Sequence, residues 1–85
     1  MKAQVSDYNG QIARGEEFLQ SRGYAPVRVR HYGSLARLEV APEQIARLAA
    51  EREEVAAFFQ TLGFTHVTVD LVGYRSGSLN EVLTQ

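Results

Sequence analysis

The chain has 85 residues, of which 45% are apolar and 22% are charged, a composition typical of one small folded domain. Nine basic and ten acidic residues give a net charge of -1, which argues against a nucleic-acid-binding protein because such proteins usually carry a basic excess. The absence of cysteine excludes disulfides, thiolate nucleophiles and cysteine-ligated zinc in this chain.

We expect residues 1–85 to form a single domain with a thin core, for which self-association is a natural supplement. No apolar run is long enough to cross a bilayer, and Met1-Lys2 is not followed by a signal-peptide core. The sequence therefore predicts a cytoplasmic protein without a membrane partner.

The first predicted element is a helix that begins at Ser6-Asp7, where either side chain can cap it. Tyr8, Ile12 and Leu19 follow at helical spacing, and Gly23 is expected to end the helix.

Residues 27–40 are expected to form a β-hairpin around Gly33-Ser34, because apolar and polar residues alternate on both sides of that turn. One face of the hairpin is apolar. The other face carries Arg28, Arg30, Arg37 and Glu39.

A long helix is expected to begin at Pro42 and to be closed by Gly63. Alternation over residues 66–72 predicts a third strand. A capping box that begins at Ser78 predicts a short C-terminal helix from about Leu79.

These elements predict an α+β fold, a small two-layer α-β-β-α-β domain. Its three-stranded mixed sheet should carry two helices on one face, and the short helix should end the chain. A right-handed crossover should make the third strand parallel to the second. We expect the first strand of the hairpin to lie at the centre of the sheet.

The polar face of the sheet should gather Arg28, Arg30, Arg37, Glu39 and Asp70, away from the two helices. Guanidinium groups suit phosphate or sulfate, and acidic neighbours can pair with them or hold a cation such as Mg²⁺. The alternative is a solvated face with cross-strand ion pairs and no ligand.

The glycine- and serine-rich loop over residues 73–78 offers Arg75, Ser76 and Ser78 just before a predicted helix N-terminus, a favourable place for an anion. The alternative is a capped turn with a surface arginine. The loop lacks the pattern of a P-loop.

Three segments together resemble the C-terminal domain of the Lar-type sulfur transferases: Arg28–His31, Ala36–Val40 and Asp70–Glu81. These enzymes belong to the PP-loop ATP-pyrophosphatase superfamily and make the nickel-pincer cofactor of lactate racemase. The similarity runs from about Ile12 to Leu83. It is most specific in the Gly-Tyr-Arg-Ser-Gly-Ser run.

The resemblance implies a family that adenylylates a carboxylate of a pyridinium mononucleotide, installs sulfur, and assembles as trimers or hexamers. It also implies that this domain contributes charged residues to an inter-subunit pocket for phosphate groups and metal. The matching positions are Arg28, Arg30 and Arg75 for the anion, with Glu16 and Glu39 as the residues for a divalent cation.

Two features of the family are absent from this sequence: the Ser-Gly-Gly-x-Asp-Ser ATP loop and a cysteine that could donate sulfur. The isolated chain is therefore expected to be non-catalytic, an accessory domain that binds a phosphate-containing ligand and mediates oligomerisation. Its expected partners are further copies of itself and a separate PP-loop domain, and its only expected cofactor is a divalent cation beside the phosphate. The alternative is a free-standing oligomerising interaction module without a ligand.

Overall fold

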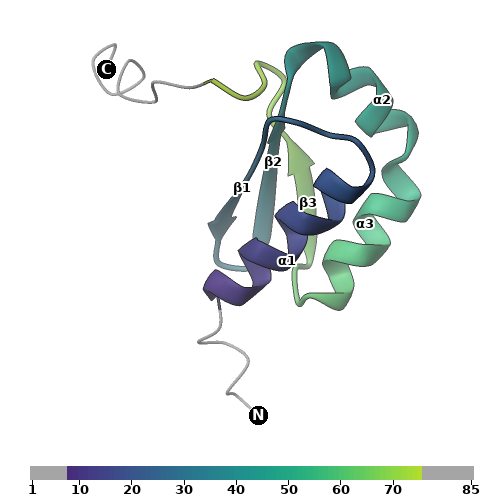
Figure 1. The fold of residues 1–85 in the computed structure, drawn as a ribbon. Helices are drawn as coiled ribbons and strands as arrows, with labels where there is room; N and C mark the ends of the chain where they lie inside the picture. The colour runs from purple at the N-terminus through teal and green to yellow at the C-terminus, as the bar shows by residue number, and fades with distance from the viewer. Residues whose placement is uncertain (1–7, 76–85) are drawn as a thin grey trace.

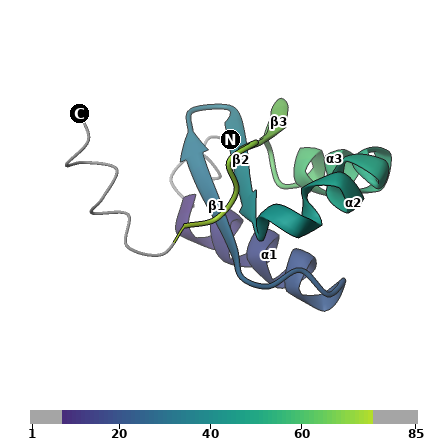
Figure 2. The same cartoon turned by 90° about the horizontal axis from the view of Figure 1, so that it is seen from above.

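A computed structural model describes residues 8–75, and it has the predicted α+β architecture, with a three-stranded mixed sheet and helices packed on one of its faces (Figures 1 and 2). Within residues 8–75 no helix is both long and apolar enough to cross a membrane. The elements in chain order are α1 (Tyr8–Ser21), β1 (Val27–Tyr32), β2 (Leu35–Val40), the 3-10 helix η2 (Pro42–Gln44), α2 (Ile45–Ala50), α3 (Arg52–Thr61) and β3 (His66–Val69).

The strand order is β1-β2-β3, with β1 antiparallel and β3 parallel to β2. The parallel pairing confirms the predicted relation of the second and third strands. The prediction that the first strand lies at the centre was wrong, because β2 occupies that position. One reason is that α1 covers the outer edge of β1, where the Glu16 carboxylate accepts a hydrogen bond from the Val29 N–H at 3.0 Å.

The hairpin register assigns each side chain to a face of the sheet. Val29 lies opposite Leu38 on the apolar face, and both are buried. Arg30 lies opposite Arg37 on the other face, because directly opposed residues point to the same side. Gly33 forms the turn with φ of 58°, a backbone conformation that suits glycine.

Both glycines that were predicted to end helices do so, with positive φ at Gly23 and Gly63. After α1, the Tyr24 N–H donates to the Leu19 carbonyl at 3.0 Å, and after α3 the Phe64 N–H donates to the Phe59 carbonyl at 3.2 Å. These bonds satisfy carbonyl groups that the helices leave unpaired. The predicted start of the first helix, at Ser6-Asp7, and the short helix from Leu79 lie outside the described residues.

The helix that was predicted to run without interruption from Pro42 is broken at Glu51 into α2 and α3. Glu51 has φ of -98° and ψ of 23°, which interrupts the helical backbone. Its carboxylate accepts hydrogen bonds from the Tyr24 hydroxyl at 2.8 Å and the Arg47 Nε at 3.3 Å. The break therefore coincides with a contact between the helices and the loop that precedes β1.

The third strand is shorter than predicted, since β3 ends at Val69 rather than at Val72. The Asp70 carboxylate accepts the Val72 N–H at 2.9 Å, and the Asp70 carbonyl accepts the Gly73 N–H at 3.0 Å. These local bonds turn the chain, as aspartate and glycine commonly do. Leu71, which continues the alternation of Val67 and Val69, lies beyond the end of the strand and is 80% exposed.

The core lies between the apolar face of the sheet and the helices, and Phe59 of α3 is fully buried in it. The ring of Phe59 packs against α1 at Gly15, where an added Cβ would stand 2.5 Å from a ring carbon. Phe64 packs back against Phe59, with ring centroids 6.2 Å apart.

The contact between Tyr24 and Glu51 is expected to make stability dependent on acid pH. Burial and the hydrogen bond to Glu51 raise the pKa of the Tyr24 hydroxyl to about 12. The same hydrogen bond, with help from Arg47, lowers the pKa of the Glu51 carboxyl below its usual value of 4.5. A depressed carboxyl pKa stabilises the fold above that usual value, and the contribution is lost as the pH falls through the lower, folded-state pKa.

We therefore expect Glu51→Gln to lower the free energy of unfolding at about pH 7, and the difference from the parent to shrink by about pH 3. Urea unfolding at a series of pH values measures this. Glu53→Gln, at an exposed position two residues away, is the matched control and should give a small difference at every pH. A constant difference for Glu51→Gln across the range would contradict the assignment.

Candidate functional site

The sheet face that points away from the helices carries the charged side chains that the alternation predicted. We call this set, Arg28, Arg30, Arg37, Glu39 and Asp70, the charged face. Its arginines come from both strands of the hairpin, and Arg30 and Arg37 lie directly opposite each other. Two like charges in that relation are unfavourable unless an opposite charge stands between them.

Glu39 supplies that opposite charge. It lies directly opposite Arg28 in the register, and its side chain is only 9% exposed. Its carboxylate accepts a hydrogen bond from Arg37 at 2.9 Å, and its other oxygen lies 3.5 Å from the Arg30 Nε. Glu39 is therefore a nearly buried anion beside the guanidinium groups of Arg30 and Arg37.

Arg37 has a second set of neighbours on its other side. Its Nε lies 3.8 Å from an Asp70 oxygen, and its guanidinium stands 5.3 Å from the centre of the Tyr32 ring. Although burial acts in the opposite direction, the hydrogen bond to Glu39 and the charges of both carboxylates raise the pKa of Arg37 above its usual value. The Arg37 guanidinium therefore stays charged, and Glu39, Asp70 and Tyr32 already surround it.

Arg28 and Arg30 make fewer contacts with carboxylates of the charged face than Arg37 does. The Arg28 guanidinium lies 5.6 Å from the centre of the Tyr74 ring, and no carboxylate of residues 8–75 forms an ion pair with it. The Arg30 Nε lies near Glu39 without a hydrogen bond from within the described residues. These two guanidinium groups leave the same face of one strand, and they retain donors for an anion.

The segment after β3 crosses back over the sheet toward β1, which Figure 2 shows from above. The Tyr74 N–H donates to the Val40 carbonyl at 2.7 Å, and Gly73 packs so closely that an added Cβ would lie 2.9 Å from that carbonyl oxygen. This crossing places the Tyr74 ring against the Arg28 guanidinium, and Arg75 follows Tyr74 in the chain. Arg75 itself is exposed. Ser76 and Ser78, the other predicted anion ligands of the loop, lie outside the described residues.

The two predicted cation ligands do not meet within one chain. Glu16 binds the Val29 N–H at the edge of β1, whereas Glu39 lies on the charged face between its arginines. Among residues 8–75 no group of three or more histidine, aspartate or glutamate side chains could hold a metal ion. The assignment of Glu16 and Glu39 to a divalent cation stays a prediction.

Two aromatic residues of this face were not identified from the sequence. Tyr32 covers Arg37, and Tyr74 covers Arg28. The strand pattern offers a signal for Tyr32, since it alternates with His31 and falls on the same face as Arg30. No local pattern places Tyr74, because its position depends on the turn at Asp70.

The fold and the charged face together define a small α+β module with an arginine-rich sheet surface. No protein-family model matches the chain. It is 46% identical over 76 residues to an uncharacterised protein of Synechocystis sp., a match that covers 87% of this chain. It is 38% identical over 79 residues, or 93% of this chain, to the pyridinium-3,5-bisthiocarboxylic acid mononucleotide synthase of Lactiplantibacillus plantarum. A third relative, an uncharacterised protein of Methanocaldococcus jannaschii, is 36% identical over 61 residues, or 72% of this chain.

The chain spans less than a third of the length of each of these relatives, between 24% and 29%. The similarity to the synthase agrees with the Lar-type resemblance of the sequence.

Proposed function

We propose that this chain is an accessory domain of a Lar-type sulfur transferase system, and that it binds a phosphate-containing ligand on the charged face without catalysing a reaction alone. The observation that carries the proposal is the convergence of Arg28, Arg30 and Arg37 on one sheet face, to which residues 8–75 contribute two carboxylates, Glu39 and Asp70. An anion would balance the remaining positive charge and accept hydrogen bonds from the guanidinium groups.

The similarity to a synthase that is named for a mononucleotide product supports a phosphate group as the anion. The absence of cysteine supports a non-catalytic role, because sulfur that is donated by the protein needs a thiol. Catalysis would then belong to a separate PP-loop domain. A cytoplasmic location stays a prediction.

A divalent cation beside the phosphate is part of this proposal. Glu39 is close enough to the arginines to share such a cation with a bound phosphate, and carboxylate oxygens suit Mg²⁺. Glu16 would have to come from a neighbouring subunit, because within one chain it is bound to the edge of β1.

The alternative function is an oligomerising interaction module that has no ligand. This alternative is favoured because the positive charge of the arginines is already partly neutralised, since Glu39 contacts two of the three. The two functions differ in whether phosphate stabilises the fold.

Thermal melting against phosphate concentration at constant ionic strength tests the proposal. At a phosphate concentration ten times Kd, binding should stabilise the parent by about 1.4 kcal/mol, or about 6–10 °C in a domain of this size. Arg30→Ala should gain less than half of that shift. Arg52→Ala, at an exposed position on α3, is the matched control and should gain as much as the parent. Equal shifts in Arg30→Ala and the parent, or no shift in either, would support the module without a ligand.

We also propose that the chain assembles as a trimer or a hexamer. Its core is thin, and a small domain gains stability when it buries further surface against copies of itself. Light scattering at micromolar concentration should give three or six times the chain mass of 9.5 kDa. A clean monomer at every concentration would reject the oligomer and leave the anion site to be judged by the melting experiment.

A further inference from the structure

One edge of the sheet is open along β3. The His66 N–H donates to the Ser34 carbonyl at 3.1 Å, and the Asp70 N–H donates to the Leu38 carbonyl at 2.9 Å. Main-chain groups alternate in direction along a strand, so the N–H and C=O groups of Val67 and Val69 point away from β2. Within residues 8–75 no strand lies on that side, because β3 ends the strand order.

The opposite edge of the sheet is partly covered. The outward-pointing N–H of Val29 on β1 is bound by the Glu16 carboxylate at 3.0 Å, and α1 lies along that strand. A strand that added to this sheet would therefore add at β3.

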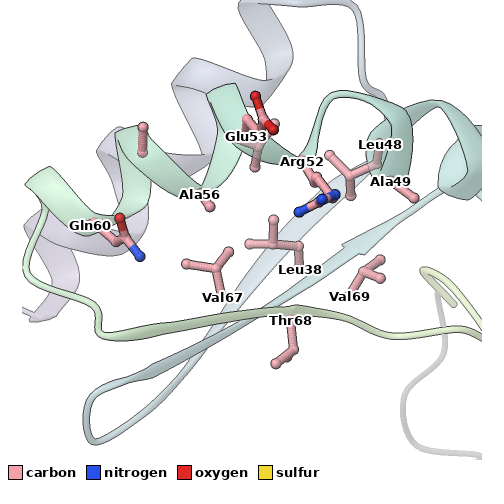
Figure 3. Close-up of a pocket in the computed structure, with 12 residues that line it drawn as sticks. Leu38, Leu48, Ala49, Arg52, Glu53, Ala56, Gln60, Val67, Thr68 and Val69 are labelled. Carbon is pink, nitrogen blue, oxygen red and sulfur yellow. The ribbon is translucent and has the colours of Figure 1, made fainter.

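A groove of about 420 Å³ runs beside the open edge, between β3 and the helices α2 and α3 (Figure 3). The side chains of Val67 and Val69 point up into it, whereas Thr68 points to the other side of the strand. The rest of its wall is mainly apolar, and Arg52 and Gln60 add polar groups. The apolar wall is formed by Leu38, Leu48, Ala56, Val67 and Val69.

The edge and the groove together match an extended strand. Its main chain would pair with Val67 and Val69, and every second side chain would enter the groove. Alanine at position 56 leaves room for a side chain of medium size, such as valine or leucine.

A second copy of this chain does not fit the edge in the same way. Paired β3 strands would lie about 4.8 Å apart, and α3 lies over β3, so the two α3 helices would approach much closer than the 8–10 Å that packed helices require. The groove therefore suits a strand that has no helix of its own on this face.

We propose that this edge and groove dock an extended strand of the PP-loop domain that works with this module. The inference rests on the proposed function. It is supported by the longer relatives, in which more than two thirds of the polypeptide lies outside the matched segment and is available to supply such a strand.

Hydrogen exchange of the β3 amides tests the proposal. The two samples are the chain alone and a chimera of the Lactiplantibacillus plantarum synthase in which this chain replaces the matched segment. In the chain alone the Val67 and Val69 amides should exchange fast, and the Asp70 amide, which bonds to β2, should exchange slowly. In the chimera the Val67 and Val69 amides should exchange at least about 100-fold more slowly.

Two variants of the chimera separate groove docking from general stabilisation. Ala56→Gln fills the groove and should restore fast exchange at Val67 and Val69. Ala46→Gln, at an exposed position on α2 outside the groove, should leave the slow exchange unchanged. If the chimera does not fold, the same amides are compared at the aligned positions of the synthase itself.

Unchanged exchange at Val67 and Val69 in the full-length context would overturn the inference. Slow exchange in the chain alone that depends on protein concentration would also overturn it, because the occupant would then be a second copy. Neither result touches the phosphate site, which the melting experiment judges separately.

Discussion

Phe59→Ala is expected to lower the free energy of unfolding by about 3–5 kcal/mol. The side chain is fully buried, and its ring packs edge-on against Phe18 of α1 and Phe58 of α3 and lies against the backbone of α1 at Gly15. The cavity cannot collapse easily, because Gly15 has no side chain to move into it. A domain of this size is stable by only about 5–10 kcal/mol, so the variant should be close to unfolding at 37 °C.

Urea unfolding measures this loss, and Phe58→Ala is the matched control on the same helix. Phe58 is half-buried and stacks on Phe18 with ring centroids 4.0 Å apart, so its truncation should cost about 1–2 kcal/mol. Equal losses for the two variants would mean that Phe59 is not the centre of the core.

Glu39→Ala should have the second largest effect, and this effect should depend on phosphate. Removal of the carboxylate leaves Arg30 and Arg37 opposed on neighbouring strands with no charge between them. Breaking a fully buried pair costs about 3–5 kcal/mol, but each arginine is about one third exposed, so we expect about 2 kcal/mol. The melting temperature should fall by about 10 °C.

Phosphate should restore part of the stability of Glu39→Ala, because the anion can take the place of the missing carboxylate among the arginines. The melting temperature of this variant should therefore rise more steeply with phosphate, at constant ionic strength, than that of the parent. Glu53→Ala, at an exposed position on α3, controls for the loss of one negative charge. If phosphate stabilises neither Glu39→Ala nor the parent, the arginines do not act as an anion site. An equal gain in both would mean that the anion does not take the place of the Glu39 carboxylate.

Much of the candidate site could be predicted from the sequence. Alternation placed Arg28, Arg30 and Glu39 on one face of a hairpin, and the register confirms that placement. Anion binding by these residues stays a prediction, as does cation binding at Glu16 and Glu39. The Lar-type resemblance implied that Arg75 belongs with Arg28 and Arg30. Strand alternation alone does not relate two segments that lie so far apart in the chain.

The position of Tyr74 shows why the rest of the site could not be predicted. Tyr74 reaches Arg28 because the chain turns at Asp70 and the Tyr74 N–H binds the Val40 carbonyl. The alternation over residues 66–72 predicts a longer strand. It does not reveal the turn, which depends on two hydrogen bonds that Asp70 accepts.

The sequence by itself determined the hairpin, its turn at Gly33 and the ends of α1 and α3 at Gly23 and Gly63. These features depend on side-chain alternation and on backbone conformations that glycine adopts easily, both of which are local. Gly15 lies within a helix, where glycine is less favourable than alanine. Only the structure explains this residue, because the Phe59 ring occupies the space that a side chain would need.

Only the tertiary structure decided that β2 is central and that the helix after it breaks at Glu51. Both depend on contacts between residues far apart in the chain. Glu16 binds the edge of β1 across 13 positions, and Tyr24 binds Glu51 across 27. Local propensity is a weak preference that such contacts override, because each of them satisfies a polar group that the fold has partly removed from water.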